Sequence, residues 1–260
     1  MKWDPATYVQ FGDYRNRPFF DLTARIHADR PLRVVDLGCG PGNLTATLAE
    51  RWPGARVLGL DSSAEMLAKA ASLAEEESSL QFEQADIADW MPAPETDVVV
   101  SNAALQWVPG HQDMMRRWLE ALRPGAWFAM QVPGNFNAPS HSLMRELASS
   151  YEWAARLDGV LRGGESVGEP ADYLGLLLDA GCEADAWETT YQQVLPGPDP
   201  VLDWVRGTAL RPVLAALGDG DARRFETDYA AALRDAYPRG VHGTVFPFRR
   251  IFAVGRKAGG

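Results

Sequence analysis

The first part of the chain alternates between short apolar runs and longer stretches with apolar residues at helical spacing. The runs are rich in Val, Leu, Phe or Met, which is typical of buried strands. We expect strands at Leu32–Leu37, Arg56–Leu60, Leu80–Ala85, Thr96–Ser101 and Ala126–Val132, and helices at Asn43–Trp52, Ala64–Glu77 and His111–Leu122. This alternation implies right-handed crossovers, and therefore a parallel sheet with helices on both faces.

The rest of the chain is less regular and predicts a helical insertion before the last strand. We expect helices at Ser140–Leu157, Ala171–Ala180, Val201–Leu217 and Asp221–Tyr237, and strands at Cys182–Leu195 and Val245–Arg256. The expected fold is therefore α/β, with a mostly parallel seven-stranded sheet. The insertion, at about residues 198–240, would form a cap over the carboxyl edge of that sheet.

Two helix starts carry local signals. Ser62-Ser63-Ala64-Glu65 has the pattern of a capping box and begins the helix after the second strand. Asp199-Pro200 supplies an N-cap acid and a first-turn proline to the helix that follows the Pro-rich loop. Both signals locate a helix start independently of the apolar spacing.

Charge narrows the range of partners. The 260 residues carry a formal net charge of −10, which argues against sequence-independent nucleic-acid binding and against docking on anionic lipid. Of the cationic side chains, 22 are Arg and three are Lys. Residues 14–33 have a local charge of +3 and residues 238–260 a local charge of +5. This distribution suits a protein that excludes nucleic acid and admits a small polyanion.

The cysteine content and the N-terminal sequence bear on location. Cys39 and Cys182 are too few for a disulfide framework, which favours a reducing compartment. The sequence MKWDPATYVQFG lacks an apolar signal core, and no apolar run approaches the roughly 18 residues of a membrane span. No His, Cys and Asp spacing suggests a metal site. We therefore expect a cytoplasmic protein without a bound metal.

The most informative stretch is the loop after the first strand, Val34-Val35-Asp36-Leu37-Gly38-Cys39-Gly40-Pro41-Gly42-Asn43. Its glycines let the backbone turn sharply into a helix and approach a ligand closely. Their spacing is G-x-G-x-G, whereas a dinucleotide fold uses G-x-G-x-x-G to seat a pyrophosphate. Asp36 would repel a pyrophosphate but orient an ammonium group. A ligand with nucleoside and amino-acid ends fits this loop better than a phosphate chain.

Polar residues also mark the ends of the next three strands. Asp61 and Ser62 follow the second strand, where ribose hydroxyls would lie. Asp86 and Ile87 follow the third strand, and the acid can accept from an adenine amine while Ile87 covers the ring. The fourth strand ends in Asn102, with Trp107 shortly after it. One such acid is usually a helix cap and one glycine loop often only a tight turn, but their order on successive strands favours S-adenosylmethionine binding.

These motifs resemble class I S-adenosylmethionine-dependent methyltransferases, whose signature loop matches DLGCGPGN. Along nearly its whole length the chain more narrowly resembles the trans-aconitate 2-methyltransferase family. The matching stretches are WDPATYVQF, RNRP, VVDLGCGPGNLT, LDSSAEML, QADIADW, SNAALQWVPGH, SHSLMREL, AGCEADAWETTY, DWV, ALRP and FPFRRIFAVGRK. The resemblance implies a Rossmann-like fold and methyl transfer to one carboxylate of trans-aconitate or a related tricarboxylate, giving a monomethyl ester and S-adenosylhomocysteine.

The resemblance also assigns cofactor roles to residues. Gly38 and Gly40 would hold the methionine part, with Asp36 near its amino group. Asp61, followed by Ser62, would hold the ribose. Around the adenine the resemblance implies Met66, Asp86 and Ile87, and near the sulfonium Asn102. From the order of the expected elements we predict a single domain, 1–260, with an N-terminal lid segment (1–31), a cofactor-binding core (32–135) and a substrate-side half (136–260).

The chain departs from the family pattern in two places. Ser72–Ser79 is longer and more acidic than usual, which predicts an exposed insertion after the second strand. Trp153–Gly168 is also longer and has extra glycines near the expected cap, so it bears on substrate fit.

Methyl transfer to a carboxylate needs no general base, because the acceptor is already ionised at pH 7. Binding a tricarboxylate instead requires Arg, His, Tyr or Trp donors around a covered pocket. Our substrate-binding candidates are Trp107, Tyr191, Arg211, Arg249, Tyr8, Trp204 and His141, with Arg15, Arg145 and Arg250 as further cations. Arg249 and Arg250 point to opposite faces of a strand, so at most one should reach the pocket.

The sequence is also compatible with other functions. The chain could esterify or alkylate another small molecule, and a phenol acceptor would need a base such as His111. It could also bind S-adenosylmethionine without catalysis. The loop spacing disfavours an NAD-dependent oxidoreductase, and the charge disfavours an RNA methyltransferase. We expect a monomer or a weak dimer whose partner is a small polycarboxylate.

Overall fold

The predicted strands form one sheet. A computed structural model describes residues 12–74, 79–161, 163 and 166–259, and within them the sheet has eight strands in the order β3-β2-β1-β4-β5-β8-β6, with β7 beside β8. The strands are β1 (Arg33–Leu37), β2 (Arg56–Asp61), β3 (Leu80–Gln84), β4 (Val98–Asn102), β5 (Trp127–Pro133), β6 (Cys182–Leu195), β7 (Arg239–Gly240) and β8 (Gly243–Lys257). From β3 to β5 every pairing is parallel, as predicted. The strand order reverses direction at β1 and β4, where open α/β sheets bind ligands.

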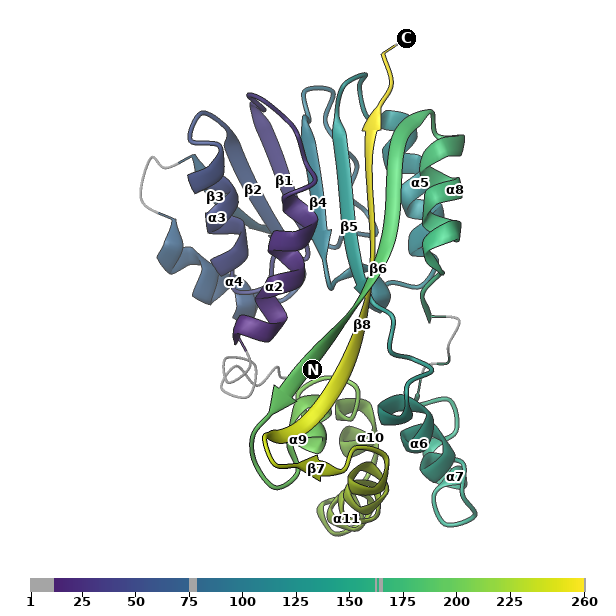
Figure 1. The fold of residues 1–260 in the computed structure, drawn as a ribbon. Helices are drawn as coiled ribbons and strands as arrows, with labels where there is room; N and C mark the ends of the chain where they lie inside the picture. Colours follow the sequence, from purple (N-terminus) through teal and green to yellow (C-terminus); the bar gives the residue numbers. More distant parts are fainter. Residues whose placement is uncertain (1–11, 75–78, 162, 164–165, 260) are drawn as a thin grey trace. The chain divides into compact units, whose positions relative to one another are not determined.

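Helices occupy the connections between these strands (Figure 1). The described helices are α2 (Gly12–Thr23), α3 (Asn43–Arg51), α4 (Ala64–Ala70), η1 (Ala71–Leu73), η2 (Leu105–Trp107), α5 (His111–Ala121), α6 (Pro139–Ala148), α7 (Ala154–Leu157), α8 (Pro170–Asp179), α9 (Pro200–Arg206), α10 (Arg211–Ala216) and α11 (Asp219–Ala236). Three of them, α9, α10 and α11, lie between β6 and the C-terminal strand, as the sequence predicted.

The chain groups into two compact units. One, the sheet unit, comprises 16–132, 168–188 and 251–260, and the other, the helical unit, comprises 1–15, 133–167 and 189–250. Strands β6 and β8 contribute residues to both units. This grouping does not test the predicted single domain with divisions after residues 31 and 135, which remains a prediction.

The two faces of the sheet unit carry different side chains. Asp36 on β1 is in register with Val100 on β4, which is in register with Ala129 on β5, so these three side chains share one face. The Asp36 carboxylate accepts a hydrogen bond from the Thr45 hydroxyl of α3, which places α3 over that face. Phe128 points to the other face, where its ring lies 6.3 Å from that of Trp118 on α5. Helices therefore cover both faces, as right-handed crossovers require.

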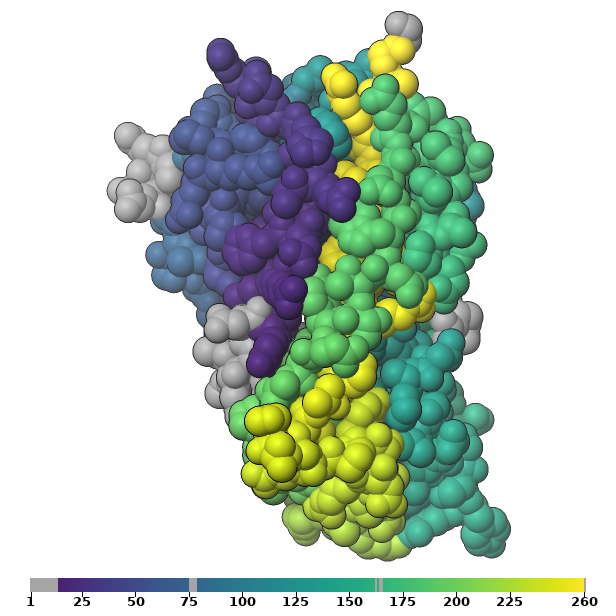
Figure 2. All heavy atoms as spheres, viewed as in Figure 1, coloured from purple at the N-terminus to yellow at the C-terminus, as the bar shows by residue number. Residues whose placement is uncertain are grey.

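Residues 16–33 also cover part of the sheet unit, and they are purple at its surface in Figure 2. Phe19 and Leu22 of α2 are buried, while Phe20 between them is exposed, so one side of this helix faces the core. Such one-sided burial is what an amphipathic helix provides.

The helical unit has its own aromatic core. Trp153, Phe225 and Phe246 are fully buried, and the rings of Trp153 and Phe225 lie 5.6 Å apart. At Ser140, the start of α6 is hydrogen-bonded to Tyr229 of α11 and to Tyr237, the residue that follows α11. The Ser140 amide donates to the Tyr237 hydroxyl at 3.0 Å, and the Tyr229 hydroxyl donates to the Ser140 carbonyl.

Two predicted helices are broken in the structure. The expected helix Ser140–Leu157 is α6 and α7, because the chain turns after Ala148 and so buries Trp153 completely. The expected helix Val201–Leu217 is α9 and α10. Pro212 lies in the first turn of α10, where proline is tolerated, whereas inside a continuous helix it would remove a hydrogen bond.

Other boundaries also differ from the prediction. Helix α4 ends at Ala70 and continues as η1, so the expected helix to Glu77 was too long; residues 75–78, within the expected acidic insertion, lie outside the described residues. Its N-cap is Ser63, which accepts from the Met66 amide at 3.4 Å, and not Ser62. The two-residue strand β7 was not predicted.

The N-cap prediction for Asp199 holds only in position. Asp199 precedes α9, but its side chain makes no capping bond. Both carboxylate oxygens instead accept from Arg234 of α11, at 2.6 and 2.7 Å, so this acid joins two helices.

Candidate active site

The glycine loop after β1 is built from three left-handed glycines. A Cβ on Gly38 (φ +77°) would lie 2.2 Å from the Ala104 Cβ, and one on Gly42 (φ +80°) would lie 2.6 Å from the Phe82 ring. These two glycines are required by the protein's own packing. At Gly40 (φ +57°) a Cβ would meet nothing within 4 Å. Gly40 therefore presents its backbone to open space, where a ligand can approach.

Asp61 fixes the shape of this loop. One carboxylate oxygen accepts from the Gly40 amide at 2.9 Å, and the other accepts from the Ser63 amide at 2.8 Å. The same acid thus connects the loop after β1 with the start of α4. Each oxygen keeps a second lone pair, so Asp61 can still accept from ligand hydroxyls. The Ser62 carbonyl next to it accepts from the Gln84 side chain at 3.1 Å.

Asp36 lies under the loop and is almost fully buried, with 3% of its surface exposed. Burial raises the pKa of Asp36 to about 6, the Thr45 hydroxyl that donates at 2.6 Å opposes this, and the charge of Asp61 adds to it. A cation beside Asp36 would favour its ionised form. This environment fits the predicted role of holding an ammonium group.

Cys39 belongs to the same loop and is buried. Burial raises the pKa of its thiol, and the nearby charges of Asp36 and Asp61 raise it further. The thiol therefore stays protonated.

The predicted adenine residues lie at the ends of neighbouring elements. Met66 on α4 and Ile87 after β3 are both buried apolar side chains. One oxygen of Asp86 accepts from the Ala88 amide at 2.9 Å, which orients the acid and leaves its other oxygen available.

The ends of β4 and β5 hold a pair of amide side chains. Asn102 and Gln131 are in register, and the backbone amide of Ala103 donates to the backbone carbonyl of Gln131 at 2.9 Å. Ala103 adopts φ +54°, which is rare for a residue other than glycine. Among the described residues, nothing hydrogen-bonds the Asn102 side-chain oxygen or either amide atom of the fully buried Gln131. Unsatisfied buried amides cost stability, so this pair is suited to binding a ligand.

Asn102 was predicted from the sequence as a site residue, whereas Gln131 was not. The available signal was a single polar residue in the otherwise apolar strand WFAMQVP. A buried amide at the carboxyl end of a parallel strand is expected to have a polar partner.

Trp107 and His111 lie close together in the sequence but differ in environment. Trp107 ends η2 and is exposed. His111 is buried, with one ring nitrogen 3.3 Å from the Val108 carbonyl and the other 2.8 Å from the Tyr173 hydroxyl. Burial lowers the pKa of His111. Both its nitrogens are engaged in structural contacts, which argues against its use as the base for a phenol.

His141 is also held in a structural arrangement. Its Nδ1 lies 3.0 Å from the Ser140 hydroxyl. Burial, with a smaller effect of the Arg145 charge, lowers the pKa of His141 to about 4. The ring is therefore neutral at pH 7 and brings no positive charge. Arg145 donates to the Phe136 carbonyl at 2.6 Å.

The remaining candidates for binding the substrate that accepts the methyl group belong to the helical unit. Tyr191 and Trp204 are buried, and Arg211, at the start of α10, is half-buried. Of the two adjacent arginines on β8, Arg250 is buried and Arg249 is half-buried, as alternation along a strand predicts. Tyr8 lies outside the described residues.

The sequence-predicted residues thus divide between the two units. All the predicted cofactor residues lie in the sheet unit, at the ends of β1 to β4 and on α4. Apart from Trp107, the substrate-binding candidates among the described residues lie in the helical unit. Within the described ranges, no group of three His, Cys, Asp or Glu side chains is arranged to hold a metal ion. None of the described helices has the length and apolar character to cross a membrane.

Comparison with known proteins identifies the class. Residues 34–125 match the family model described as a methyltransferase domain. The phosphoethanolamine N-methyltransferase 2 of Haemonchus contortus, solved with S-adenosyl-L-methionine, is 16% identical with a TM-score of 0.56, covering 94% of this chain and 53% of that one. The YcgJ protein of Bacillus subtilis is 17% identical with a TM-score of 0.55, covering 89% and 94%. The fold and the loop after β1 are those of the class I S-adenosylmethionine-dependent methyltransferases, as predicted.

Curated relatives narrow the class to a family. The trans-aconitate 2-methyltransferase of Streptomyces avermitilis is 55% identical, covering 98% of this chain and 97% of the relative. Those of Rhodococcus jostii and Mycobacterium tuberculosis are 55% and 49% identical, again over nearly the full length of both chains. The chain belongs to the trans-aconitate 2-methyltransferase family. This confirms the predicted family and the prediction of an S-adenosylmethionine-dependent enzyme.

Proposed function

We propose that the protein transfers the methyl group of S-adenosylmethionine to one carboxylate of trans-aconitate, giving a monomethyl ester and S-adenosylhomocysteine. The observation that carries this proposal is the 49–56% identity, over nearly the full chain, to relatives named for that reaction. Gly40 and the link of its amide to Asp61 support it, because a Cβ at Gly40 would meet nothing within 4 Å and the protein's own packing therefore does not explain the glycine there.

The residues of the sheet unit fit the cofactor. Gly38 and Gly40 shape the backbone for its methionine part, and Asp36 holds the ammonium group. Asp61 and Ser62 bind the ribose hydroxyls. The adenine lies against apolar side chains and next to an acid, for which we propose Met66, Ile87 and Asp86. When bound, S-adenosylmethionine supplies a methyl group activated by its sulfonium.

The protein contributes binding and alignment to the reaction. The acceptor carboxylate is ionised at pH 7, so no side chain has to remove a proton. This agrees with the engagement of His111 and His141 in structural contacts. Alignment of two bound reactants can lower a barrier by about 7–11 kcal/mol. Asn102 and Gln131, at the ends of adjacent strands, offer neutral donors to the acceptor carboxylate without protonating it.

Our proposal for acceptor binding keeps the predicted residues Trp107, Tyr191, Trp204, Arg211, Arg249, His141 and Tyr8. The neutral ring of His141 would contribute a hydrogen bond and not a charge. We further propose that the protein acts in the cytoplasm as a monomer or weak dimer, for which the acidic net charge and the two isolated cysteines are the support.

The test is a labelling experiment. The purified protein is incubated with methyl-labelled S-adenosylmethionine and a panel of dicarboxylates, tricarboxylates and phenols, and the base-labile label is counted. We expect label in an ester with trans-aconitate. Label on a phenol, or cofactor binding without label on any acid, would contradict the proposal. Asp61→Ala, which removes the loop contact, serves as the control with impaired cofactor binding.

A further inference from the structure

Gln131 of the sheet unit combines complete burial with a lack of hydrogen-bond partners. It lies on β5 and is 0% exposed, and among the residues that the structure describes nothing hydrogen-bonds its Nε2 or its Oε1. Burying an amide in this way is unfavourable, because the group gives up its bonds to water and gains none in return. A ligand that supplies the missing bonds explains such a residue directly.

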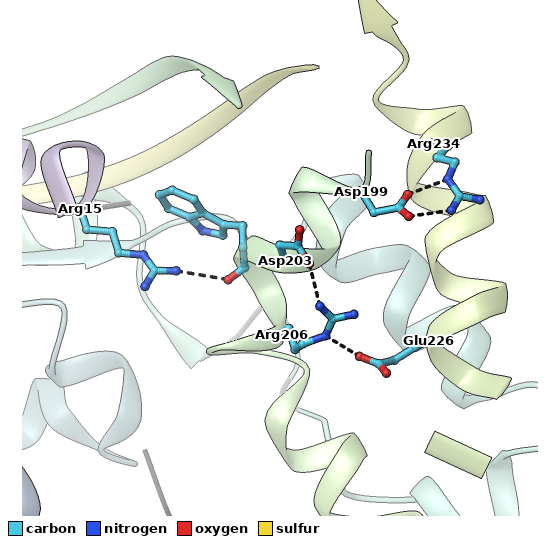
Figure 3. A network of polar contacts seen from close by, with 7 residues as sticks. Arg15, Asp199, Asp203, Arg206, Glu226 and Arg234 are labelled. Carbon is cyan, nitrogen blue, oxygen red and sulfur yellow. Dashed lines mark hydrogen bonds and ion pairs between the residues drawn. The ribbon is translucent and has the colours of Figure 1, made fainter. Parts of the chain in front are cut away.

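Several charged side chains of the helical unit show the more usual arrangement, in which the protein satisfies its own polar groups. Arg206 donates to Asp203 at 2.6 Å and to Glu226 at 2.7 Å. Arg234 forms a bidentate pair with Asp199, at 2.6 and 2.7 Å (Figure 3). These groups are partly exposed and are nevertheless paired. The buried amide of β5 therefore differs from them in what it requires from outside the chain.

Strand order places Gln131 one strand beyond the cofactor residues. Across the sheet, β2, β1, β4 and β5 follow one another, and Asn102 at the end of β4 is in register with Gln131. The residues after β4 lie against the glycine loop, since a Cβ on Gly38 would be 2.2 Å from the Ala104 Cβ. Adjacent strands are about 5 Å apart. With the methionine end at Gly38 and the sulfonium near Asn102, as proposed above, Gln131 lies next to the group that attacks the methyl.

The carboxamide also lies on the required side of the sheet. Asp36, Val100 and Ala129 share one face, and side chains two residues apart on a strand point the same way. Asn102 and Gln131 therefore face the same side as Asp36, the acid that we assign to the cofactor's ammonium group. All of these residues belong to the sheet unit.

A carboxamide suits a point where an anion meets a cation. Its N–H group donates to a carboxylate, its carbonyl oxygen attracts a positive group, and neither end exchanges a proton at neutral pH. The acceptor carboxylate and the sulfonium of the proposed reaction are such a pair. They have to approach in line, with the reacting atoms about 3–3.5 Å apart. One glutamine can contact both reactants and restrict the carboxylate to that approach.

We propose that Gln131 positions the carboxylate that receives the methyl group, by donating from Nε2 to the carboxylate oxygen that does not attack. This inference rests on the proposed function and deepens it, because it assigns the reacting carboxylate to one residue, with Asn102 between that residue and the cofactor loop. Gln131 thereby also determines specificity. A donor without an accompanying base favours acceptors that are already ionised, and it does not help a phenol to lose its proton.

Three variants test the proposal. Gln131→Met keeps the length of the side chain and removes both polar ends, and Gln131→Glu keeps the shape and replaces the donor with a negative charge. Thr96→Val is the matched control in the same unit. Thr96 is 1% exposed and nothing among the described residues hydrogen-bonds its hydroxyl, but it precedes β4 and so lies at the opposite end of the strands. For each protein, kcat and KM for trans-aconitate, the dissociation constant of S-adenosylhomocysteine and the thermal unfolding midpoint are measured.

We expect Gln131→Met to lower kcat/KM about 10–100-fold, the range for a lost hydrogen bond to a charged group. Affinity for S-adenosylhomocysteine should change less than about twofold. The unfolding midpoint should equal or exceed that of the parent, because unpartnered polar atoms are no longer buried. Thr96→Val should share this stability and keep the parent kinetics.

Two results would overturn the proposal. One is a kcat/KM for Gln131→Met within about twofold of the parent, less than the loss of any hydrogen bond to a charged group. The other is a lowered unfolding midpoint with an equal loss of S-adenosylhomocysteine affinity, since Gln131 would then support only the structure.

The pH profile of Gln131→Glu gives a second readout. Burial and the anionic acceptor raise the pKa of the introduced carboxyl, which donates again once it is protonated. Between pH 8 and pH 6 we expect kcat/KM of this variant to rise about fivefold or more while that of the parent changes less than about twofold. Cofactor is kept saturating, because Asp36 has a pKa of about 6. The same profile in variant and parent would contradict the assigned contact.

Ester formation by the parent separates this inference from the proposed function. If the parent esterifies trans-aconitate and Gln131→Met does so equally well, only the inference fails. If the parent forms no ester with any acid, the proposed function fails. Calorimetric binding of trans-aconitate, with S-adenosylhomocysteine present, then tests Gln131 by itself: about tenfold weaker binding by Gln131→Met supports the contact, and no difference overturns it.

Discussion

The two units differ in how they position polar groups. In the sheet unit the candidate residues follow successive strands, and backbone amides hold the acids in place, as at Asp61 and Asp86. In the helical unit the charged groups Arg15 and Arg250 stack on aromatic rings. The first arrangement follows from strand order, and the second depends on side-chain packing. Substitutions in each unit test how far the two arrangements are independent.

The largest effect is expected at Gly38 in the sheet unit. Gly38→Ala places a Cβ 2.2 Å from the Ala104 Cβ at a φ of +77°, so both a clash and backbone strain arise. We expect a loss of about 3 kcal/mol or more in the free energy of unfolding and no measurable cofactor binding. Thermal unfolding and calorimetry with S-adenosylhomocysteine check this. Gly125→Ala, with φ +83° and nothing within 4 Å, is the control and should cost only about 1 kcal/mol.

The helical unit can be weakened separately through Phe225. This fully buried ring packs 5.6 Å from Trp153, and Phe225→Ala is expected to destabilise the unit by about 3–5 kcal/mol. Cofactor affinity, measured below the unfolding temperature, should stay within about twofold. A tenfold loss of that affinity would show that the two units are energetically coupled, and the comparison would fail.

Asp61 tests the link between the glycine loop and α4. In Asp61→Asn the side chain is neutral and only one oxygen remains, so one of the two backbone amides now held at 2.8 and 2.9 Å loses its acceptor and the other keeps an uncharged one. We expect the dissociation constant of S-adenosylhomocysteine to rise about 10–100-fold, corresponding to about 1.5–3 kcal/mol. The dissociation constant of trans-aconitate should not change, and a parallel loss there would contradict the separation of roles.

The smallest effect is the pH dependence conferred by Asp36. Its pKa in the folded protein is about 6, and a cofactor ammonium group favours the ionised form. Lowering the pH from 7.5 to 5.5 should therefore weaken S-adenosylhomocysteine binding about fourfold, and Asp36→Asn should remove this dependence. The contribution of Asp36 to folding stability changes with pH in the opposite direction. Because the folded pKa is raised, this group favours the folded state at low pH and loses that contribution as the pH rises through 6.

The sequence was sufficient for the sheet unit because its signals are local. Each apolar run ended within a residue or two of the observed strand, and Asp36, Asp61 and Asn102 followed from their places at strand ends. The same approach missed Gln131, because a polar residue inside an apolar strand was not weighed as a site.

The helical unit was less predictable for a physical reason. Its helices break where burial of Trp153 and the position of Pro212 require it, and apolar spacing alone does not reveal such turns. The stacking of Arg15 on Trp204 joins residues 189 positions apart. Contacts of that range are set by the completed fold.

The buried thiol of Cys39 has a practical consequence for the chemical resilience of the protein. Alkylating agents and peroxides react with thiolates, and a thiol whose pKa is raised offers almost none at neutral pH. Cys182 is also buried, and burial raises its pKa as well. The cofactor loop therefore carries a cysteine that behaves as a small apolar side chain. Iodoacetamide or mild oxidation should leave both cysteines of the folded protein unmodified, without any need for a reducing agent.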